Sequence, residues 1–98
     1  MQDAYNEVLR LVCTNATHRK GFRLLEISEE QPLNHAIEEI RELLNAKPEE
    51  KLDELADAFG CLLHYAVRRG FTLPEIERAM LQKFKVRFTP DNDRRPPQ

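Results

Sequence analysis

The chain has 98 residues, of which 41% are hydrophobic and 33% charged, and a formal net charge of −2. This length predicts one domain, and the small net charge gives no general attraction to nucleic acids or acidic membranes. No apolar run approaches the roughly 20 residues that span a bilayer, and the first residues lack the basic and apolar parts of a signal peptide. Two cysteines are too few for a disulfide framework. We therefore expect a reduced, cytoplasmic protein that binds neither nucleic acid nor membrane.

The first part of the chain predicts one helix followed by a less regular segment. The apolar residues of this helix recur at the i, i+3, i+4, i+7 spacing of an amphipathic helix; they are Tyr5, Val8, Leu9 and Val12. We expect the helix to begin near Asp3 and to fade between Thr14 and Gly21. Residues 22–32 carry apolar side chains without helical spacing, which favours an extended segment held against the core.

Two further helices are predicted in the middle of the chain. The second begins near Pro32, because proline suits the first helical turn, and it carries apolar residues on one side and acids on the other. The third runs from about Pro48 to Arg69, with an apolar arc of roughly 200° that predicts burial on two sides. Gly60 costs about 1 kcal/mol inside a helix relative to alanine, and a close helix–helix approach would explain it.

The last helix is predicted from its end signals. Gly70 suits a left-handed cap for the third helix, and Thr72 and Glu75 have the spacing of a capping box for the fourth. The fourth helix should continue to about Phe88. We therefore expect a single helical domain over residues 1–88 and a disordered tail over residues 89–98, since the tail has no apolar periodicity.

Five carboxylates form two spaced groups on the second and third predicted helices. The first group is Glu38-Glu39-x-x-Glu42 and the second is Glu54-x-x-Asp57. Acids three or four residues apart share a helix face, and a short turn between the two helices allows the two faces to meet as an antiparallel pair. Such an oxygen-rich site suits hard cations such as Mg²⁺. The alternative is an ordinary solvated acidic face, which most acid runs on helices are.

The paired groups resemble the EExxE…ExxD signature of MazG-like nucleoside triphosphate pyrophosphohydrolases. The resemblance extends from His35 to Phe88, somewhat over half of the chain. It implies an all-α fold, a four-helix MazG-like bundle assembled as a homodimer or homotetramer. It also implies Mg²⁺ dependence, with Mn²⁺ as a substitute, and cleavage between the α- and β-phosphates.

The resemblance also assigns roles to particular residues. It implies that Glu39, Glu42, Glu54 and Asp57 hold the metal, and that Glu38 and Glu39 act in catalysis, with Glu38 as a metal ligand or as the group that orients the attacking water. Lys83 and Arg87 match the family's basic pair on the fourth helix only loosely. They would hold substrate phosphates, or they are a solvated basic helix end favoured by the helix dipole.

The expected function is hydrolysis of a ribo- or deoxyribonucleoside triphosphate to the monophosphate and pyrophosphate. A related phosphoribosyl-ATP pyrophosphohydrolase activity is one alternative, and a non-catalytic helical interaction module is another. Many relatives hold the base with an N-terminal aromatic residue, often tryptophan, and this chain has no tryptophan. The base, the sugar and the residues that contact them are therefore left open by the sequence.

Overall fold

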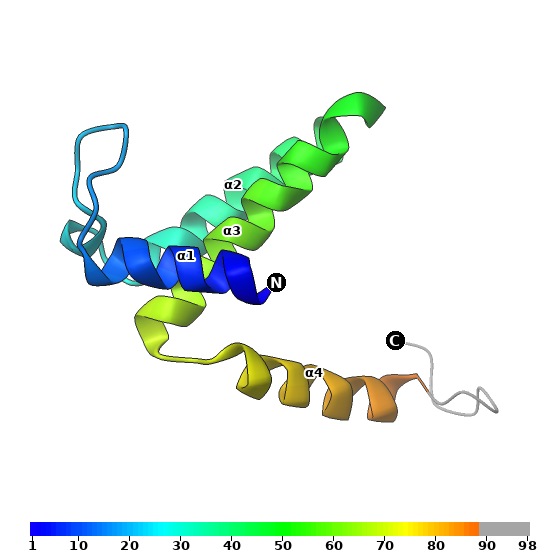
Figure 1. Ribbon diagram of the computed structural model, residues 1–98. Coiled ribbons are helices and arrows are strands. Elements are labelled where there is room, and N and C mark those ends of the chain that lie inside the picture. The colour runs from blue at the N-terminus through cyan, green and yellow to red at the C-terminus, as the bar shows by residue number, and fades with distance from the viewer. Residues whose placement is uncertain (89–98) are drawn as a thin grey trace.

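The computed structural model describes residues 1–88, which form four α-helices and no strand (Figure 1). The helices are α1 (Gln2–Cys13), α2 (Gln31–Asn45), α3 (Lys51–Arg69) and α4 (Leu73–Arg87), and short 3₁₀ turns occupy Leu24–Glu26 and Pro48–Glu50. The all-helical class predicted from the sequence is confirmed for these residues. The tail predicted for residues 89–98 lies outside the described part of the chain.

The helices begin and end close to the signals in the sequence, although α3 begins at Lys51, after a 3₁₀ turn that starts at Pro48. Pro32 occupies the first turn of α2, and Gly70 ends α3 in the left-handed conformation with φ at 77°. At the start of α4 the backbone N–H of Thr72 donates to Oε1 of Glu75 over 2.9 Å, and the backbone N–H of Glu75 donates to Oγ1 of Thr72 over 3.4 Å. This reciprocal capping satisfies two backbone donors that the helix itself leaves free.

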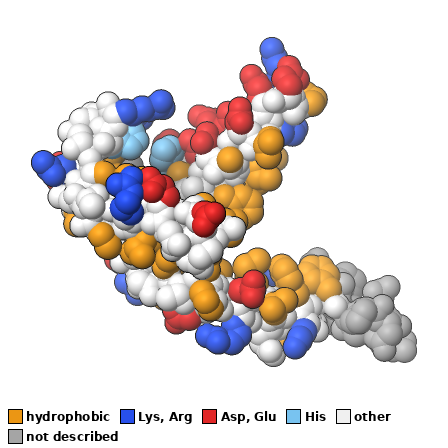
Figure 2. All heavy atoms as spheres, viewed as in Figure 1, with side chains coloured by type: hydrophobic (Ala, Val, Ile, Leu, Met, Phe, Trp, Pro, Cys, Tyr) orange, Lys and Arg blue, Asp and Glu red, His pale blue; other side chains and the backbone are white. Residues whose placement is uncertain are grey.

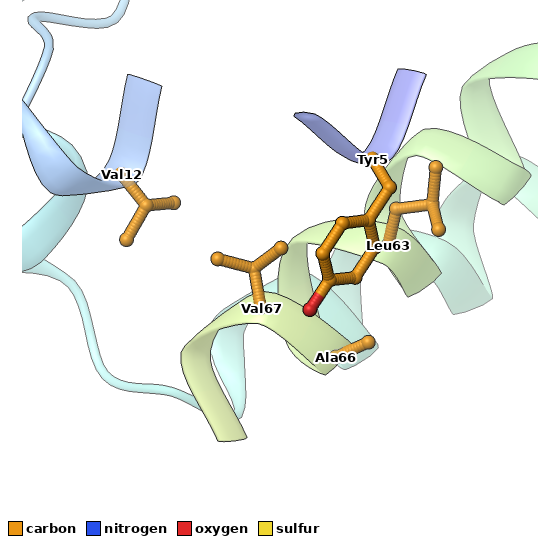
Figure 3. Close-up of a cluster of buried hydrophobic side chains, with 5 residues drawn as sticks. All are labelled: Tyr5, Val12, Leu63, Ala66 and Val67. Carbon is orange, nitrogen blue, oxygen red and sulfur yellow. The ribbon is translucent and has the colours of Figure 1, made fainter. Parts of the chain in front are cut away.

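The core lies where α1 crosses α3, while α2 and α3 run side by side as an antiparallel hairpin (Figure 1). Five buried side chains from α1 and the second half of α3 form the core cluster (Figure 3): Tyr5, Val12, Leu63, Ala66 and Val67. The hydroxyl of Tyr5 also donates a hydrogen bond to the backbone carbonyl of Phe71, just beyond the end of α3. The core therefore fixes the C-terminal half of α3, and within residues 1–88 no third helix lies beside the other end of the hairpin (Figure 1).

The segment between α1 and α2 is a bent loop rather than the extended segment expected for residues 22–32. Asn15 adopts a φ of 51°, and its side-chain oxygen accepts a hydrogen bond from the backbone N–H of Leu25 over 2.9 Å. The guanidinium of Arg68 on α3 donates to the carbonyls of Leu24 and Ile27, each over 3.0 Å. Leu24 packs against the core, whereas Leu25 is half exposed. The loop is thus held by these hydrogen bonds together with the packing of Leu24 on the core.

Helix α3 packs against α2 and, in its second half, against α1, but part of its apolar arc stays uncovered by the described residues. A row of large apolar residues on the hairpin stays exposed: Ile37, Ile40, Leu44, Leu52, Leu55, Phe59 and Leu62. Outside its own stretch of helix backbone, a Cβ atom at Gly60 would meet no atom of the described residues within 4 Å, so no close helix approach within residues 1–88 explains this glycine. Helix α4 has no buried residue and extends away from the hairpin (Figure 1). Figure 2 shows apolar side chains on the sides of the hairpin and of α4 that face each other.

The core predicts that two leucines contribute very differently to the free energy of unfolding. Leu63 is 8% exposed in the core, whereas Leu9 on α1 is 39% exposed. Leu63→Ala should lower the free energy of unfolding by about 2–5 kcal/mol, because it removes buried methyl groups and leaves a cavity. Leu9→Ala is the matched control and should change it by only about 0.5 kcal/mol. Urea unfolding followed by circular dichroism measures both, and equal losses for the two variants would contradict this core.

Candidate metal site on the hairpin

The α2–α3 hairpin brings three of the predicted metal ligands together. Glu39 and Glu42 lie one turn apart on α2, and Glu54 lies in the first turn of α3. One carboxylate oxygen from each of these residues lies within 4.8 Å of the others. We refer to Glu39, Glu42 and Glu54 as the acid cluster. The antiparallel arrangement explains the meeting, because the start of α3 returns along the last turns of α2.

Two oxygens of the acid cluster lack any hydrogen-bond partner among the described residues. They are Oε2 of Glu39 and Oε2 of Glu54, and both atoms are buried. Glu39 as a whole is only 9% exposed, and its other oxygen lies 3.0 Å from Nε2 of His35, one turn earlier on α2. A buried carboxylate oxygen without a donor is costly, so the arrangement favours a proton or a cation between these side chains.

The pKa values of the cluster shift in the direction that this crowding requires. Burial raises the pKa of Glu39, and the negative charges of Glu42 and Asp57 raise it further. The pKa of Glu54 is also raised, first by burial and then by a hydrogen bond to Glu42 and the charge of Glu42. Both shifts mean that the charged forms are disfavoured until a positive charge arrives.

Asp57 and Glu38 lie at the edge of the cluster rather than within it. Asp57 is exposed, and its oxygens do not join the three that lie within 4.8 Å, although its charge raises the pKa values of Glu39 and Glu54. Glu38 is exposed and lines a neighbouring cavity together with Cys61 and His64. Burial raises the pKa of Cys61 to about 11, which keeps this thiol protonated.

The structure does not bring the predicted phosphate-binding pair to the acids within one chain. Lys83 and Arg87 are exposed on α4, and Figure 1 shows α4 extending away from the α2–α3 hairpin. Their role as phosphate ligands therefore stays a prediction. The acids themselves form a row along the hairpin in Figure 2, with histidine side chains between this row and the loop.

Sequence reasoning missed the cavity beside the acid cluster. Its volume is about 150 Å³, and its walls come from the loop, α2 and α3. His64 lines the cavity, and its Nε2 is buried without a hydrogen-bond partner among the described residues. The sequence does contain one sign of this cavity, because His64 lies on the same polar side of α3 as Glu54, ten residues later. No pattern in the sequence indicates that the loop forms a wall, because that depends on contacts between distant parts of the chain.

Comparison with family models, with curated proteins and with solved structures finds no match to this chain. The interpretation of the acids therefore depends on their geometry and on the resemblance of the spaced motif. Within residues 1–88, none of the helices combines the length and the apolar character needed to cross a membrane.

Divalent metal should stabilise this fold. A ligand that binds only the native state at 100 times its dissociation constant adds about 2.7 kcal/mol, so millimolar Mg²⁺ or Mn²⁺ should raise the melting temperature. Glu54→Gln should remove most of this gain, because it takes one charged ligand out of the acid cluster. Differential scanning calorimetry measures both, and identical melting curves with and without metal would contradict the site.

The gain from metal should also grow with pH. Because the pKa values of Glu39 and Glu54 are raised, the metal-free native state binds more protons than the unfolded chain. The stability that these two carboxyl groups contribute is therefore lost as the pH rises through their pKa values in the folded protein. Protons and metal compete for the same carboxylate oxygens, so bound metal should restore the stability that is lost when these groups deprotonate. Asp53→Asn, an exposed change beside Glu54, is the matched control and should keep both the metal gain and its pH dependence.

Proposed function

We propose that this protein is a Mg²⁺-dependent pyrophosphohydrolase that converts a nucleoside triphosphate into its monophosphate and pyrophosphate. The observation that supports the proposal is the acid cluster, in which one carboxylate oxygen from each of three residues lies within 4.8 Å of the others. Oε2 of Glu39 and Oε2 of Glu54 are buried without hydrogen-bond partners among the described residues. Oxygen-only sites of this charge suit Mg²⁺ and Mn²⁺. The spaced motif that carries these residues supplies the resemblance to MazG-like enzymes.

Glu39, Glu42 and Glu54 would hold the metal, with Asp57 available at the edge of the cluster. A bound Mg²⁺ would lower the pKa of a water molecule and neutralise charge on the α-phosphate and on the departing pyrophosphate. His35, 3.0 Å from Glu39, restricts the orientation of that carboxylate. Glu38, which precedes Glu39 and is exposed, would ligate the metal or orient the attacking water, and a nearby carboxylate would accept the proton of that water.

We also propose that the protein acts as a homodimer or homotetramer. The apolar row of the α2–α3 hairpin and the apolar side of α4 are both exposed in one chain, and monomeric proteins rarely expose contiguous apolar patches of large area. Copies of the same chain offer matching apolar surfaces. Association would cover the hairpin on the side away from the acid cluster.

The products of the reaction test the proposed chemistry. With Mg²⁺ and a panel of nucleoside triphosphates that also includes phosphoribosyl-ATP, chromatography should show a monophosphate and pyrophosphate as the first products. Glu42→Gln and Glu54→Gln should each abolish most turnover, because each removes a ligand of the same site. The double variant should be little worse than either single one, since residues that act as a unit are not additive.

The exposed Asp53 beside Glu54 supplies the control for this experiment, and Asp53→Asn should keep nearly full activity. Orthophosphate as the first product would contradict the proposal, as would full activity in both cluster variants. Hydrolysis of phosphoribosyl-ATP alone would reassign the substrate within the same chemistry.

The proposed association predicts a mass of two or four chains in solution. Multi-angle light scattering at micromolar concentration measures it for the native protein and for a variant with Phe59→Glu and Leu62→Glu. These side chains are 47% and 45% exposed on the hairpin, and charges there should reduce the mass to that of one chain. Leu9→Glu on α1 is the control and should keep the assembly. A single-chain mass for the native protein would refute the association.

A further inference from the structure

Helix α4 carries one apolar stripe, and only the start of this stripe is covered. Leu73 and Ile76 pack against the core formed by α1 and α3. Met80, Leu81 and Phe84 follow at spacings that keep side chains on the same face of a helix, but all three are exposed. We refer to these five residues as the α4 stripe. Its first part lies on the molecule's own core, and the rest stays uncovered by the described residues.

One face of α3 is likewise covered over half of its length. In the second half of the helix, Leu63 and Ala66 are buried in the core with side chains of α1. In the first half, Leu55, Phe59 and Leu62 are exposed. Ala66 follows Phe59 by seven residues and Leu62 by four, so the covered and the exposed side chains share one face. Helix α1 thus occupies half of a face that has room for a second helix (Figure 1).

The connection between α3 and α4 directs α4 away from its own hairpin. Only residues 70–72 separate the two helices. Gly70 ends α3 in the left-handed conformation, the hydroxyl of Tyr5 holds the carbonyl of Phe71, and the reciprocal hydrogen bonds of Thr72 and Glu75 fix the first turn of α4. A short connection held at each of its residues sets the direction of the helix that follows (Figure 1). The α4 of a second copy has no such restriction.

The charges of the two uncovered surfaces are opposite. Helix α4 carries four basic and two acidic side chains, and Lys83 and Lys85, on either side of Phe84 in the sequence, border the α4 stripe on its two edges. Residues 31–57 of the hairpin carry eight acidic and three basic side chains. Opposite charges favour the pairing of α4 with a hairpin, whereas two hairpins packed on each other would bring like charges together. Residues 89–98 contain no large apolar side chain apart from proline, so their chemistry does not suit the apolar row.

We infer that two copies of this chain exchange their α4 helices, so that the α4 stripe of each copy lies on the apolar row of the other copy's hairpin. The start of each α4 stays on its own core. The exchange is reciprocal, because a two-fold interface repeats every contact, and exchange of an identical element is a low-cost route to a dimer. The inference rests on the association proposed above and does not depend on the hydrolysis.

Two variants with opposite charges test the exchange. The α4 variant carries Leu81→Glu and Phe84→Glu, and the hairpin variant carries Leu55→Lys and Phe59→Lys. All four side chains are exposed in one chain, and circular dichroism checks that both variants remain helical. Each variant alone has one damaged side in both copies of the interface, so light scattering at micromolar concentration should give the mass of one chain. The milder Phe84→Ala should raise the dissociation constant of the dimer at least about tenfold, as for a central aromatic contact.

Mixing the two variants makes the result specific. In a mixed dimer, the intact α4 of the hairpin variant lies on the intact hairpin of the α4 variant. The other interface of the same dimer brings glutamates against lysines, which attract each other. An equimolar mixture should therefore regain the mass of two chains. Val86→Glu is the control on α4, because Val86 is 69% exposed and lies on the side opposite the α4 stripe, and it should keep the dimer.

The outcomes separate this inference from the proposed function. An α4 variant that keeps the mass of two chains would overturn the exchange and leave both the association and the hydrolysis standing. A mixture that stays at the mass of one chain would also overturn the exchange. Restored mass in the mixture, without hydrolysis of any triphosphate by the native protein, would refute the enzyme and support the exchange. A single-chain mass for the native protein would overturn the exchange together with the association.

Discussion

Repulsion among the carboxylates of Glu39, Glu42 and Glu54 is the constraint on which the rest of the structure depends. Three acids share a small volume at one end of a two-helix hairpin, and the pKa values of Glu39 and Glu54 rise because their negative charges are poorly solvated and lie close together. Repulsion between like charges grows as water is excluded, so the hairpin must be held closed by contacts elsewhere. In one chain those contacts come from the packing of α2 on α3 and from the core that anchors α3 to α1.

The core is small for holding the hairpin closed against this repulsion. It consists of five buried side chains near the far end of α3, while Leu52 and Leu55, close in sequence to Glu54, remain exposed. The same two helices therefore carry charged residues that repel one another on one side and uncovered apolar residues on another. Covering the apolar side by a second copy would hold the hairpin closed at the end where the acids lie. The proposed assembly and the proposed metal site are linked in this way, because each stabilises the geometry that the other needs.

The sequence was sufficient for features that depend on near neighbours in the chain. The caps at Gly70 and Thr72 follow from local backbone chemistry, and the meeting of Glu39, Glu42 and Glu54 follows from helical spacing across a short turn. It was insufficient for the loop between α1 and α2, where Arg68 bonds carbonyls 44 and 41 residues away. It also could not place α4, because the direction of a helix after a cap depends on packing that spacing does not describe.

The polar stripe of α3 joins these features into one surface. Glu54, Cys61 and His64 follow one another along one side of the helix, and Arg68 continues the series one turn beyond His64. Glu54 belongs to the acid cluster, Cys61 and His64 line the cavity, and Arg68 holds the loop that closes it. Because one rigid helix carries all of these side chains, a shift of α3 would move Glu54 and the cavity wall together. The same helix therefore fixes the distance between the acid cluster and the cavity.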